Sequence, residues 1–132
     1  MRLNSTGLFL HSWQLNSEPL CVLIGESLLK SESIFQSIWE YEVRDNFRAE
    51  FIEAYSSKGL WVSLFEQCKG YIKTELKQDI KHPERFLTID YWQSQSAFSA
   101  MKQNISDEYN ELDKRCEAYT LSEKHIGFFS NE

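Results

Sequence analysis

The chain has 132 residues, which is enough for one domain with a single hydrophobic core. Its hydrophobic fraction of 42% and charged fraction of 26% are ordinary for a soluble globular protein, while its aromatic fraction of 14% is high for so short a chain. The formal net charge of −6 argues against a protein that binds nucleic acid, which needs clustered Lys and Arg, and against binding to anionic membranes.

Cysteine usage and hydropathy bear on the compartment. Cys21, Cys68 and Cys116 are far apart, form no CxxC pair and have no histidine at metal-ligand spacing. We therefore expect reduced thiols, a cytoplasmic location and no metal site. The N-terminus lacks the continuous apolar stretch of a signal peptide, and the longest later apolar run, 20–25, is too short to span a bilayer. We expect no membrane partner.

Residues 1–33 differ in character from the rest of the chain. They contain six serines, no clear helical period and one isolated apolar run, Cys21–Ile24. This run is compatible with an extra edge strand, a short buried segment or a loosely attached extension, and periodicity does not decide between them. We treat 1–33 as an N-terminal extension and 34–130 as the folded domain.

The first part of that domain predicts a strand followed by two helices. Residues 34–43 alternate between two faces, one of them carrying Phe35, Trp39, Tyr41 and Val43. Asp45 is a plausible N-cap for a helix that places Phe47, Phe51 and Tyr55 on one face. Residues 60–67 predict a second short helix that ends at Gly70 and presents Trp61, Leu64 and Phe65.

Two strands joined by a hairpin come next. Residues 71–79 alternate, with Ile72, Thr74 and Leu76 on one side and Tyr71, Lys73, Glu75 and Lys77 on the other. Pro83 lies in the connection 80–84. Residues 85–92 predict the return strand, with Leu87, Ile89 and Tyr91 on one side and Phe86, Thr88, Asp90 and Trp92 on the other.

The last part predicts helices and a final strand. Ser94 can cap a short helix that contains Ala97, Phe98 and Met101. The strongest helical period follows, in Ile105, Tyr109, Leu112, Cys116 and Tyr119, and we expect Tyr109, Leu112 and Cys116 to be buried together. Residues 125–130 predict a last short strand.

This order, β–α(α)–β–β–α(α)–β, predicts an α+β ferredoxin-like fold, an antiparallel sheet with helices on one face. The other face of the sheet would be bare, yet both sides of the strands carry large apolar residues. A second copy is the commonest cover for such a face, so we expect a homodimer that forms a dimeric α/β barrel.

Several short stretches resemble one family. They include Trp39-Glu40-Tyr41, Gly70-Tyr71-Ile72, Thr74-Glu75-Leu76, Phe86-Leu87-Thr88-Ile89-Asp90, Trp92-Gln93-Ser94, the helix around 112–116 and Gly127-Phe128-Phe129. Residues 34–130 resemble the antibiotic biosynthesis monooxygenase domain family of dimeric α/β barrels. The resemblance implies several activities, among them oxygenation of flat aromatic polyketides with O₂ and no cofactor, and haem degradation. The haem-degrading branch fits poorly, because residues 93–120 contain no histidine.

Cofactor-free oxygenation needs a base, a dry pocket that stabilises an anion, and aromatic walls that hold a planar ring. His125 is the first candidate base because the ordinary pKa of histidine lies near neutrality, and Asp90 and Glu40 are carboxylates inside predicted strands. The candidate ligand-binding residues are aromatic: Trp39, Tyr41, Trp61, Phe65, Tyr71 and Trp92.

Each candidate residue also fits a purely structural role. The aromatic residues fit a core or a dimer seam, the strand carboxylates fit ion pairs with Lys73 or Arg85, and His125 fits a surface site. We therefore hold two hypotheses, with no cofactor in either. One is a cofactor-independent monooxygenase that uses O₂ on a small hydrophobic or aromatic molecule, and the other is a non-catalytic dimeric ligand-binding or stress-associated protein.

Overall fold

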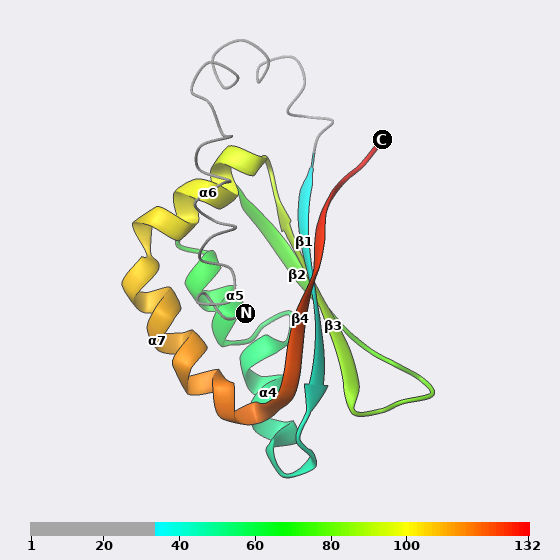
Figure 1. The fold of residues 1–132 in the computed structure, drawn as a ribbon. Helices are drawn as coiled ribbons and strands as arrows, with labels where there is room; N and C mark the ends of the chain where they lie inside the picture. The colour runs from blue at the N-terminus through cyan, green and yellow to red at the C-terminus, as the bar shows by residue number, and fades with distance from the viewer. Residues whose placement is uncertain (1–33) are drawn as a thin grey trace.

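The computed structural model describes residues 34–132, which form a four-stranded antiparallel sheet with helices on one side (Figure 1). The sheet has the order β2-β3-β1-β4, built from β1 (Phe35–Val43), β2 (Tyr71–Gln78), β3 (Arg85–Trp92) and β4 (Thr120–Ser130). The helices are α4 (Arg48–Tyr55), α5 (Leu60–Phe65), α6 (Gln95–Asn104) and α7 (Ser106–Cys116). The predicted ferredoxin-like α+β fold is confirmed. The predicted extension and its run Cys21–Ile24 lie outside the described residues.

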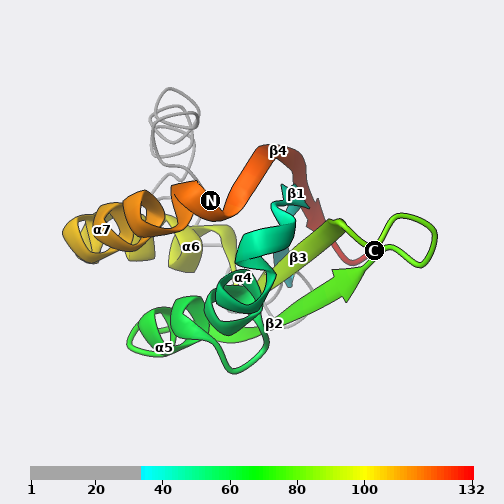
Figure 2. The same ribbon diagram turned by 90° about the horizontal axis from the view of Figure 1, so that it is seen from below.

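Helices α4, α5, α6 and α7 all lie on the same side of the sheet, and this divides the sheet into an inner and an outer face. Figure 2 shows α6 and α7 on one flank and α4 and α5 on the other. Alternation decides which side chains enter the space between helices and sheet. In β1 the inner residues Phe35, Trp39, Tyr41 and Val43 are all buried, as predicted. In β3 the buried set is Phe86, Thr88, Asp90 and Trp92, also as predicted.

The predicted alternation is wrong at the start of β2. A register shift between Tyr71 and Lys73 leaves Ile72 as an extra residue, and Ile72 is exposed. Tyr71 instead pairs with Trp92 and packs on the core, with its ring centroid 5.1 Å from that of Trp92. A bulge of this kind brings Tyr71 to the inner face, the opposite side from the one that strict alternation gives.

Three predicted boundaries also differ. Asp45 is not a helix N-cap, because it lies in a 3-10 turn, η3 (Asp45–Phe47), and α4 begins after Phe47 without a side-chain cap. Helix α5 ends at Phe65, and Gly70 forms the later turn into β2. Strand β4 begins at Thr120, directly after a second 3-10 turn, η4 (Glu117–Tyr119). It is therefore longer than the predicted strand at 125–130.

The helix pair α6–α7 follows the prediction more closely. The Ser94 hydroxyl accepts a hydrogen bond from the backbone N–H of Ala97 at 3.1 Å, so the predicted cap is confirmed. On α7, Tyr109 and Cys116 are buried, but Leu112 is only partly buried. Asp113 is buried in its place. The inward stripe of α7 is thus rotated by about one residue from the predicted one.

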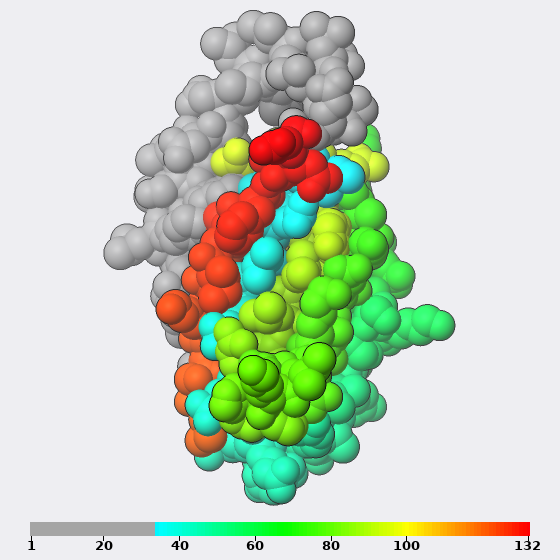
Figure 3. Space-filling model, turned by 90° about the vertical axis from the view of Figure 1, so that its right-hand side faces the viewer, coloured from blue at the N-terminus to red at the C-terminus, as the bar shows by residue number. Residues whose placement is uncertain are grey.

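The outer face of the sheet carries no helix from the described residues. Figure 3 shows the four strands side by side across it, from β4 in red through β1 and β3 to β2 in green. Its centre is apolar, with Ile38, Leu87, Ile89 and Tyr91 on the two middle strands. Charged pairs lie around this centre, among them Glu40 with Arg85 and Glu75 with Lys73.

Candidate functional site

A row of polar side chains crosses the inner face of the sheet in the middle of an otherwise aromatic core. The strand register places Thr74 of β2 opposite Asp90 of β3, and Asp90 opposite Ser37 of β1. All three are buried. At the far end of the row, Ser37 Oγ lies 3.2 Å from Nε2 of His125 on β4. The row therefore connects all four strands.

Hydrogen bonds link one half of this row into a relay. The Thr74 hydroxyl donates to Oδ1 of Asp90 at 2.6 Å, and the hydroxyl oxygens of Tyr71 and Thr74 are 2.7 Å apart. Because Thr74 has a single hydroxyl hydrogen and gives it to Asp90, the hydroxyl of Tyr71 is the donor to Thr74. Tyr71 is half-buried, so the relay leads from the boundary of the core to the buried carboxyl of Asp90.

Asp90 has the electrostatic character of a proton-transfer group. Its side chain is 2% exposed, and burial raises the pKa of its carboxyl to about 7, against the hydrogen bond from Thr74 and the charge of Lys102, which lower it. A carboxyl with a pKa near neutrality can both accept and release a proton at physiological pH. Perturbed groups of this kind concentrate at functional sites.

Lys102 of α6 is the cation among the described residues whose charge lowers the pKa of Asp90. It is 7% exposed, and its Nζ lies 3.9 Å from the ring centroid of Tyr109 and 5.5 Å from that of Phe98. Burial lowers the pKa of Lys102 to about 7, while the nearby carboxylates of Asp113 and Asp90 oppose this shift. Asp90 and Lys102 thus titrate in the same pH range from opposite directions.

His125 lies at the edge of the same interior. Its ring centroid is 4.8 Å from that of Trp39 and 4.4 Å from that of Phe128. Burial, helped by the charge of Lys102, lowers the pKa of His125 to about 4. The imidazole is therefore neutral at physiological pH and a weaker base than an ordinary histidine.

Glu40 is not brought together with the other two candidate bases. It points to the outer face of the sheet, where its Oε2 accepts a hydrogen bond from Nε of Arg85 at 2.7 Å. This bond holds the pKa of Glu40 below its ordinary value. Arg85 also binds Asp79 at 2.9 Å, so Glu40 takes part in a surface ion-pair network.

The six predicted aromatic residues all reach the interior. Five are buried and Tyr71 is partly buried. Their rings join into continuous contacts: Phe65 packs edge-on against Trp92 at 5.4 Å, and Trp61 lies 5.7 Å from Phe65. Trp39 and Tyr41 stack at 6.5 Å on the β4 side, where Tyr41 also contacts Tyr55. Aromatic side chains border the polar row at both ends, with Trp39 against His125 and Tyr71 hydrogen-bonded to Thr74.

Sequence reasoning missed the groups that complete the site. Lys102 follows Met101, one of the apolar residues of the predicted helix, and a lone lysine beside apolar residues is normally solvent-exposed. Ser37 and Thr74 are buried on the inner face of the sheet, but small hydroxyl residues on a strand carry no signal of their own. Their position beside Asp90 follows only from the strand register.

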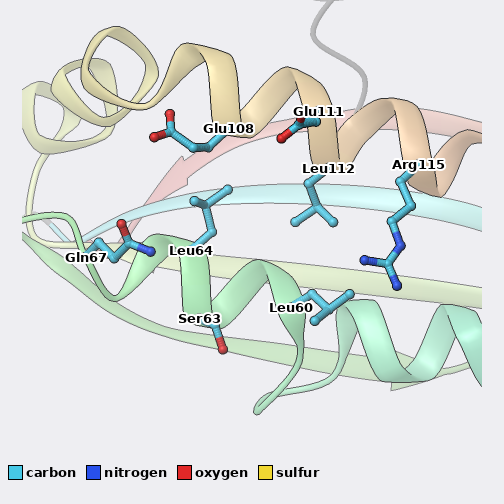
Figure 4. A pocket seen from close by; sticks show the side chains of 8 residues that line it. All are labelled: Leu60, Ser63, Leu64, Gln67, Glu108, Glu111, Leu112 and Arg115. Atoms are coloured by element: carbon cyan, nitrogen blue, oxygen red, sulfur yellow. The ribbon is translucent and has the colours of Figure 1, made fainter.

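One hollow lies away from this interior, between α5 and α7 (Figure 4). It has a volume of about 500 Å³, and Leu60 and Leu64 of α5 point toward Leu112 of α7 across it. Glu108, Glu111 and Arg115 line its α7 side. It contains none of the predicted site residues.

The described residues contain neither a cluster of metal ligands nor a membrane-spanning helix. No group of three or more His, Cys, Asp or Glu side chains among them is arranged to hold a metal ion. None of the helices in residues 34–132 is long and apolar enough to cross a membrane.

Solved structures with the same fold cover most of the chain. A conserved protein from Methanosarcina mazei matches with a TM-score of 0.60 at 15% identity, over 78% of this chain and 97% of that one. A Pseudomonas aeruginosa protein matches with a TM-score of 0.58 at 14% identity, over 77% and 97%. SnoaB, a cofactor-independent oxygenase from Streptomyces nogalater, matches with a TM-score of 0.55 at 14% identity, over 76% and 94%. At these identities the likeness shows the fold.

Comparison with sequences gives the family. No curated protein sequence matches the chain. The family model described as antibiotic biosynthesis monooxygenase matches residues 35–110, which is more than half of the chain and includes Asp90, Lys102 and Tyr109. The chain belongs to the antibiotic biosynthesis monooxygenase family.

Proposed function

We propose that this protein is a cofactor-independent monooxygenase that acts on a small, planar aromatic molecule. The observation that carries the proposal is Asp90, a buried carboxyl with a pKa near neutrality inside an aromatic interior. The family and the fold shared with SnoaB support a monooxygenase-like role. The substrate class rests on the aromatic walls, because planar rings stack favourably against aromatic side chains.

In this proposal the carboxylate of Asp90 removes an acidic C–H or O–H proton from the substrate. The substrate keeps the electron pair and becomes an electron-rich anion, which reacts with O₂ directly. For a methylene group that becomes a carbonyl, one oxygen atom enters the substrate and the other leaves as water with the two substrate hydrogens. O₂ is the oxidant and the substrate is the reductant, so no bound cofactor is needed.

The structure changes which candidate base the proposal favours. Efficient proton transfer needs a base whose pKa lies near the working pH. The pKa of Asp90 is about 7 and that of His125 about 4, so Asp90 is the better match, although His125 was the first choice from sequence. We propose that neutral His125 has a supporting role at Ser37 and that Glu40 has none in catalysis.

The homodimer belongs to the same proposal. Proteins of this family are typically dimeric, and the outer face of the sheet offers an apolar centre that no described helix covers. A second copy of the chain on this face would leave the interior around Asp90 on the opposite side of each sheet. Each subunit would then hold its own complete site.

A second candidate function, a non-catalytic ligand-binding dimer, draws on the tight packing of the interior. Asp90 is 2% exposed, and the hollow between α5 and α7 does not reach it. A substrate can contact Asp90 only if surrounding side chains move. Activity measurements separate the two functions.

The test is O₂ uptake by the purified full-length protein with a panel of anthrones, phenols and quinols. We expect O₂ uptake with at least one acidic compound. In Asp90→Asn the rate of O₂ uptake should fall by about 10²–10⁴-fold, the usual range for loss of a general base. His125→Ala should lower the rate by less than about tenfold. Full activity in Asp90→Asn would refute this role of Asp90, and no uptake across the panel would favour the non-catalytic candidate.

A further inference from the structure

The hollow between α5 and α7 has an apolar floor and a polar rim. Its floor is formed by Leu64, which is buried, and by Leu60 and Leu112, which are only partly buried. The rim consists of exposed polar side chains: Ser63, Gln67, Glu108, Glu111 and Arg115. An apolar centre inside a polar rim is typical of a surface that packs against another stretch of polypeptide.

The sequence contains an apolar run that has no place in the family fold. Residues 20–24 are five consecutive apolar residues, between Pro19 and Gly25. The family model begins at residue 35, so the shared fold gives this run no partner. Apolar side chains gain free energy when they leave water, so a run of this kind is expected to pack against an apolar surface.

The described part of the chain begins near one end of the hollow. Phe35 and Tyr71 pair with Trp92 from opposite sides, so β1 starts at the same end of the sheet as β2, which follows α5. Three ring contacts, each with centroids at most 6.0 Å apart, lead from Phe35 through Phe98 and Trp92 to Phe65. Phe65 is the last residue of α5.

The chain between the apolar run and β1 is long enough to reach the hollow. Leu64 on the floor of the hollow directly precedes Phe65. Residues 25–33 separate the run from the described residues, and fully extended they can span about 30 Å. This reach exceeds the combined length of the three ring contacts and leaves chain for a path over the surface. A tether this short gives an effective concentration on the order of millimolar, so even a weak contact is populated.

We propose that residues 20–24 dock in the hollow between α5 and α7 of the same chain. The aliphatic side chains of the run pack on Leu60, Leu64 and Leu112, and the rim side chains stay in water. This inference goes beyond the proposed function and does not depend on it, because neither the hollow nor the run contains a candidate catalytic residue.

Docking at this position links two helices that cover the interior. Helix α5 carries Trp61, and α7 carries Tyr109, whose ring packs edge-on against that of Trp61 with centroids 4.9 Å apart. The hollow lies along the same pair of helices. The docked run therefore adds a second contact between α5 and α7 beside this aromatic one.

Disulfide trapping in the full-length protein tests the proposal, because the run contains a native cysteine, Cys21. Ser63→Cys places a thiol on the α5 rim of the hollow. Gln103→Cys, at an exposed position on α6, is the matched control, since α6 contacts the start of β1 and lies within the same reach. Both variants carry Cys68→Ser, and the remaining thiol of Cys116 is buried. Equilibration in glutathione buffers, followed by peptide mass spectrometry, gives the effective concentration of Cys21 at each position.

We expect the effective concentration of Cys21 to be at least about tenfold higher at Ser63→Cys than at Gln103→Cys. Leu23→Asp should lower the value at Ser63→Cys by about tenfold or more, because an unpaired carboxylate is costly to bury against leucines. Leu10→Asp, the same change outside the run, should leave that value unchanged.

Equal effective concentrations at Ser63→Cys and Gln103→Cys would overturn the docking site, and so would an unchanged value in Leu23→Asp. A disulfide from Cys21 that joins two subunits, seen as a covalent dimer on a non-reducing gel, would assign the hollow to a second copy instead. Glu111→Cys, on the α7 rim, repeats the measurement if Ser63→Cys does not fold. None of these measurements uses O₂ uptake, so failure of the oxygenase would leave their outcome unchanged.

Discussion

At the scale of single residues, the interior moves the pKa values of its ionisable groups away from their ordinary values in opposite directions. Burial penalises the charged form of every group, so it raises the pKa of Asp90 and lowers the pKa values of Lys102 and His125. As a result, the Asp90 carboxyl and the Lys102 ammonium both have a pKa of about 7. Glu40 and Glu75 on the outer face show the contrast, because ion pairs or hydrogen bonds lower their pKa values.

The raised pKa of Asp90 predicts a pH dependence of stability. Because the folded pKa, about 7, lies above the ordinary value of 3.8, the folded state holds this proton more tightly than the unfolded state between those values. The contribution of Asp90 to stability is therefore present below about pH 4 and is lost as the pH rises to about 7. Asp90→Asn lacks this loss, so its stability relative to wild type should rise by about 2–4 kcal/mol between pH 4 and 7.5, since one pKa unit corresponds to about 1.4 kcal/mol.

Urea unfolding at a series of pH values measures that difference. Glu111→Gln, which removes an exposed carboxylate from α7, is the control and should show a nearly constant difference from wild type. A flat difference for Asp90→Asn over the same range would mean that Asp90 keeps an ordinary pKa in the folded protein.

Sequence reasoning reached part of the site. Alternation correctly placed Asp90 on the same face as Trp92, and helical and strand spacing grouped the buried aromatic residues correctly except for Tyr71, which the bulge in β2 moves to the inner face. It could not show that Ser37 and Thr74 flank Asp90, because strand register depends on pairing between segments far apart in the chain. It also could not find Lys102, since nothing local distinguishes a buried lysine from one that extends to solvent.

At the scale of elements, the positions of β2 and α6 depend on one glycine. Gly70 has φ of +92°, a region that side chains with a Cβ rarely adopt, and its backbone oxygen accepts a hydrogen bond from the N–H of Gln93 at 2.7 Å. An added Cβ would lie 2.5 Å from the Cβ of Ala97 on α6. The close approach joins the start of β2, which carries Tyr71 and Thr74, to the helix that carries Lys102.

Gly70→Ala should therefore destabilise the protein by about 1–3 kcal/mol through backbone strain, with an added cost from the contact with Ala97. The double variant Gly70→Ala/Ala97→Gly removes the contact but not the strain. We expect a coupling of at least about 0.5 kcal/mol in a double-mutant cycle measured by urea unfolding. Strict additivity would show that the two elements adjust to the methyl group without cost.

The rotated stripe of α7 gives a second prediction at this scale. Leu64 of α5 is buried, whereas Leu112 is only partly buried at the hollow between α5 and α7. Leu112→Ala should cost about 1 kcal/mol, and Leu64→Ala about 2–4 kcal/mol, because more buried surface is lost and a cavity forms. Thermal and urea unfolding of both variants measure the order. A larger loss for Leu112→Ala would restore the inward stripe that the sequence predicted.

Element order was predictable from the sequence, whereas some boundaries were not. Alternation and helical spacing gave every strand and helix between Phe35 and Ser130 in the right order. The start of β4 was missed because residues 120–124 are mostly polar and lie on an edge strand, where alternation is weak. The bulge at Ile72 was missed because it is set by pairing with β3, which no local pattern reports.

At the scale of the whole molecule, the two faces of the sheet differ in the side chains that they present. The inner face holds the polar row and the aromatic walls, and the outer face presents Ile38, Leu87, Ile89 and Tyr91 at its centre with charged pairs around them. An apolar centre with a polar surround is typical of a protein–protein interface. Since Ile38 pairs directly with Ile89, one charge at this point would affect both middle strands.

The homodimer gives the last prediction. Sedimentation equilibrium of the full-length protein at micromolar concentration should give twice the monomer mass. Ile89→Glu introduces a charge at the centre of the outer face and should shift the protein to monomer, because the partner offers that carboxylate no partner charge and desolvation would be costly. Ile52→Glu, the same change at an exposed position on α4, should leave the dimer intact because α4 is on the other side of the sheet. A wild-type monomer would rule out the barrel. If Ile89→Glu stayed dimeric and Ile52→Glu became monomeric, the interface would lie on the helices.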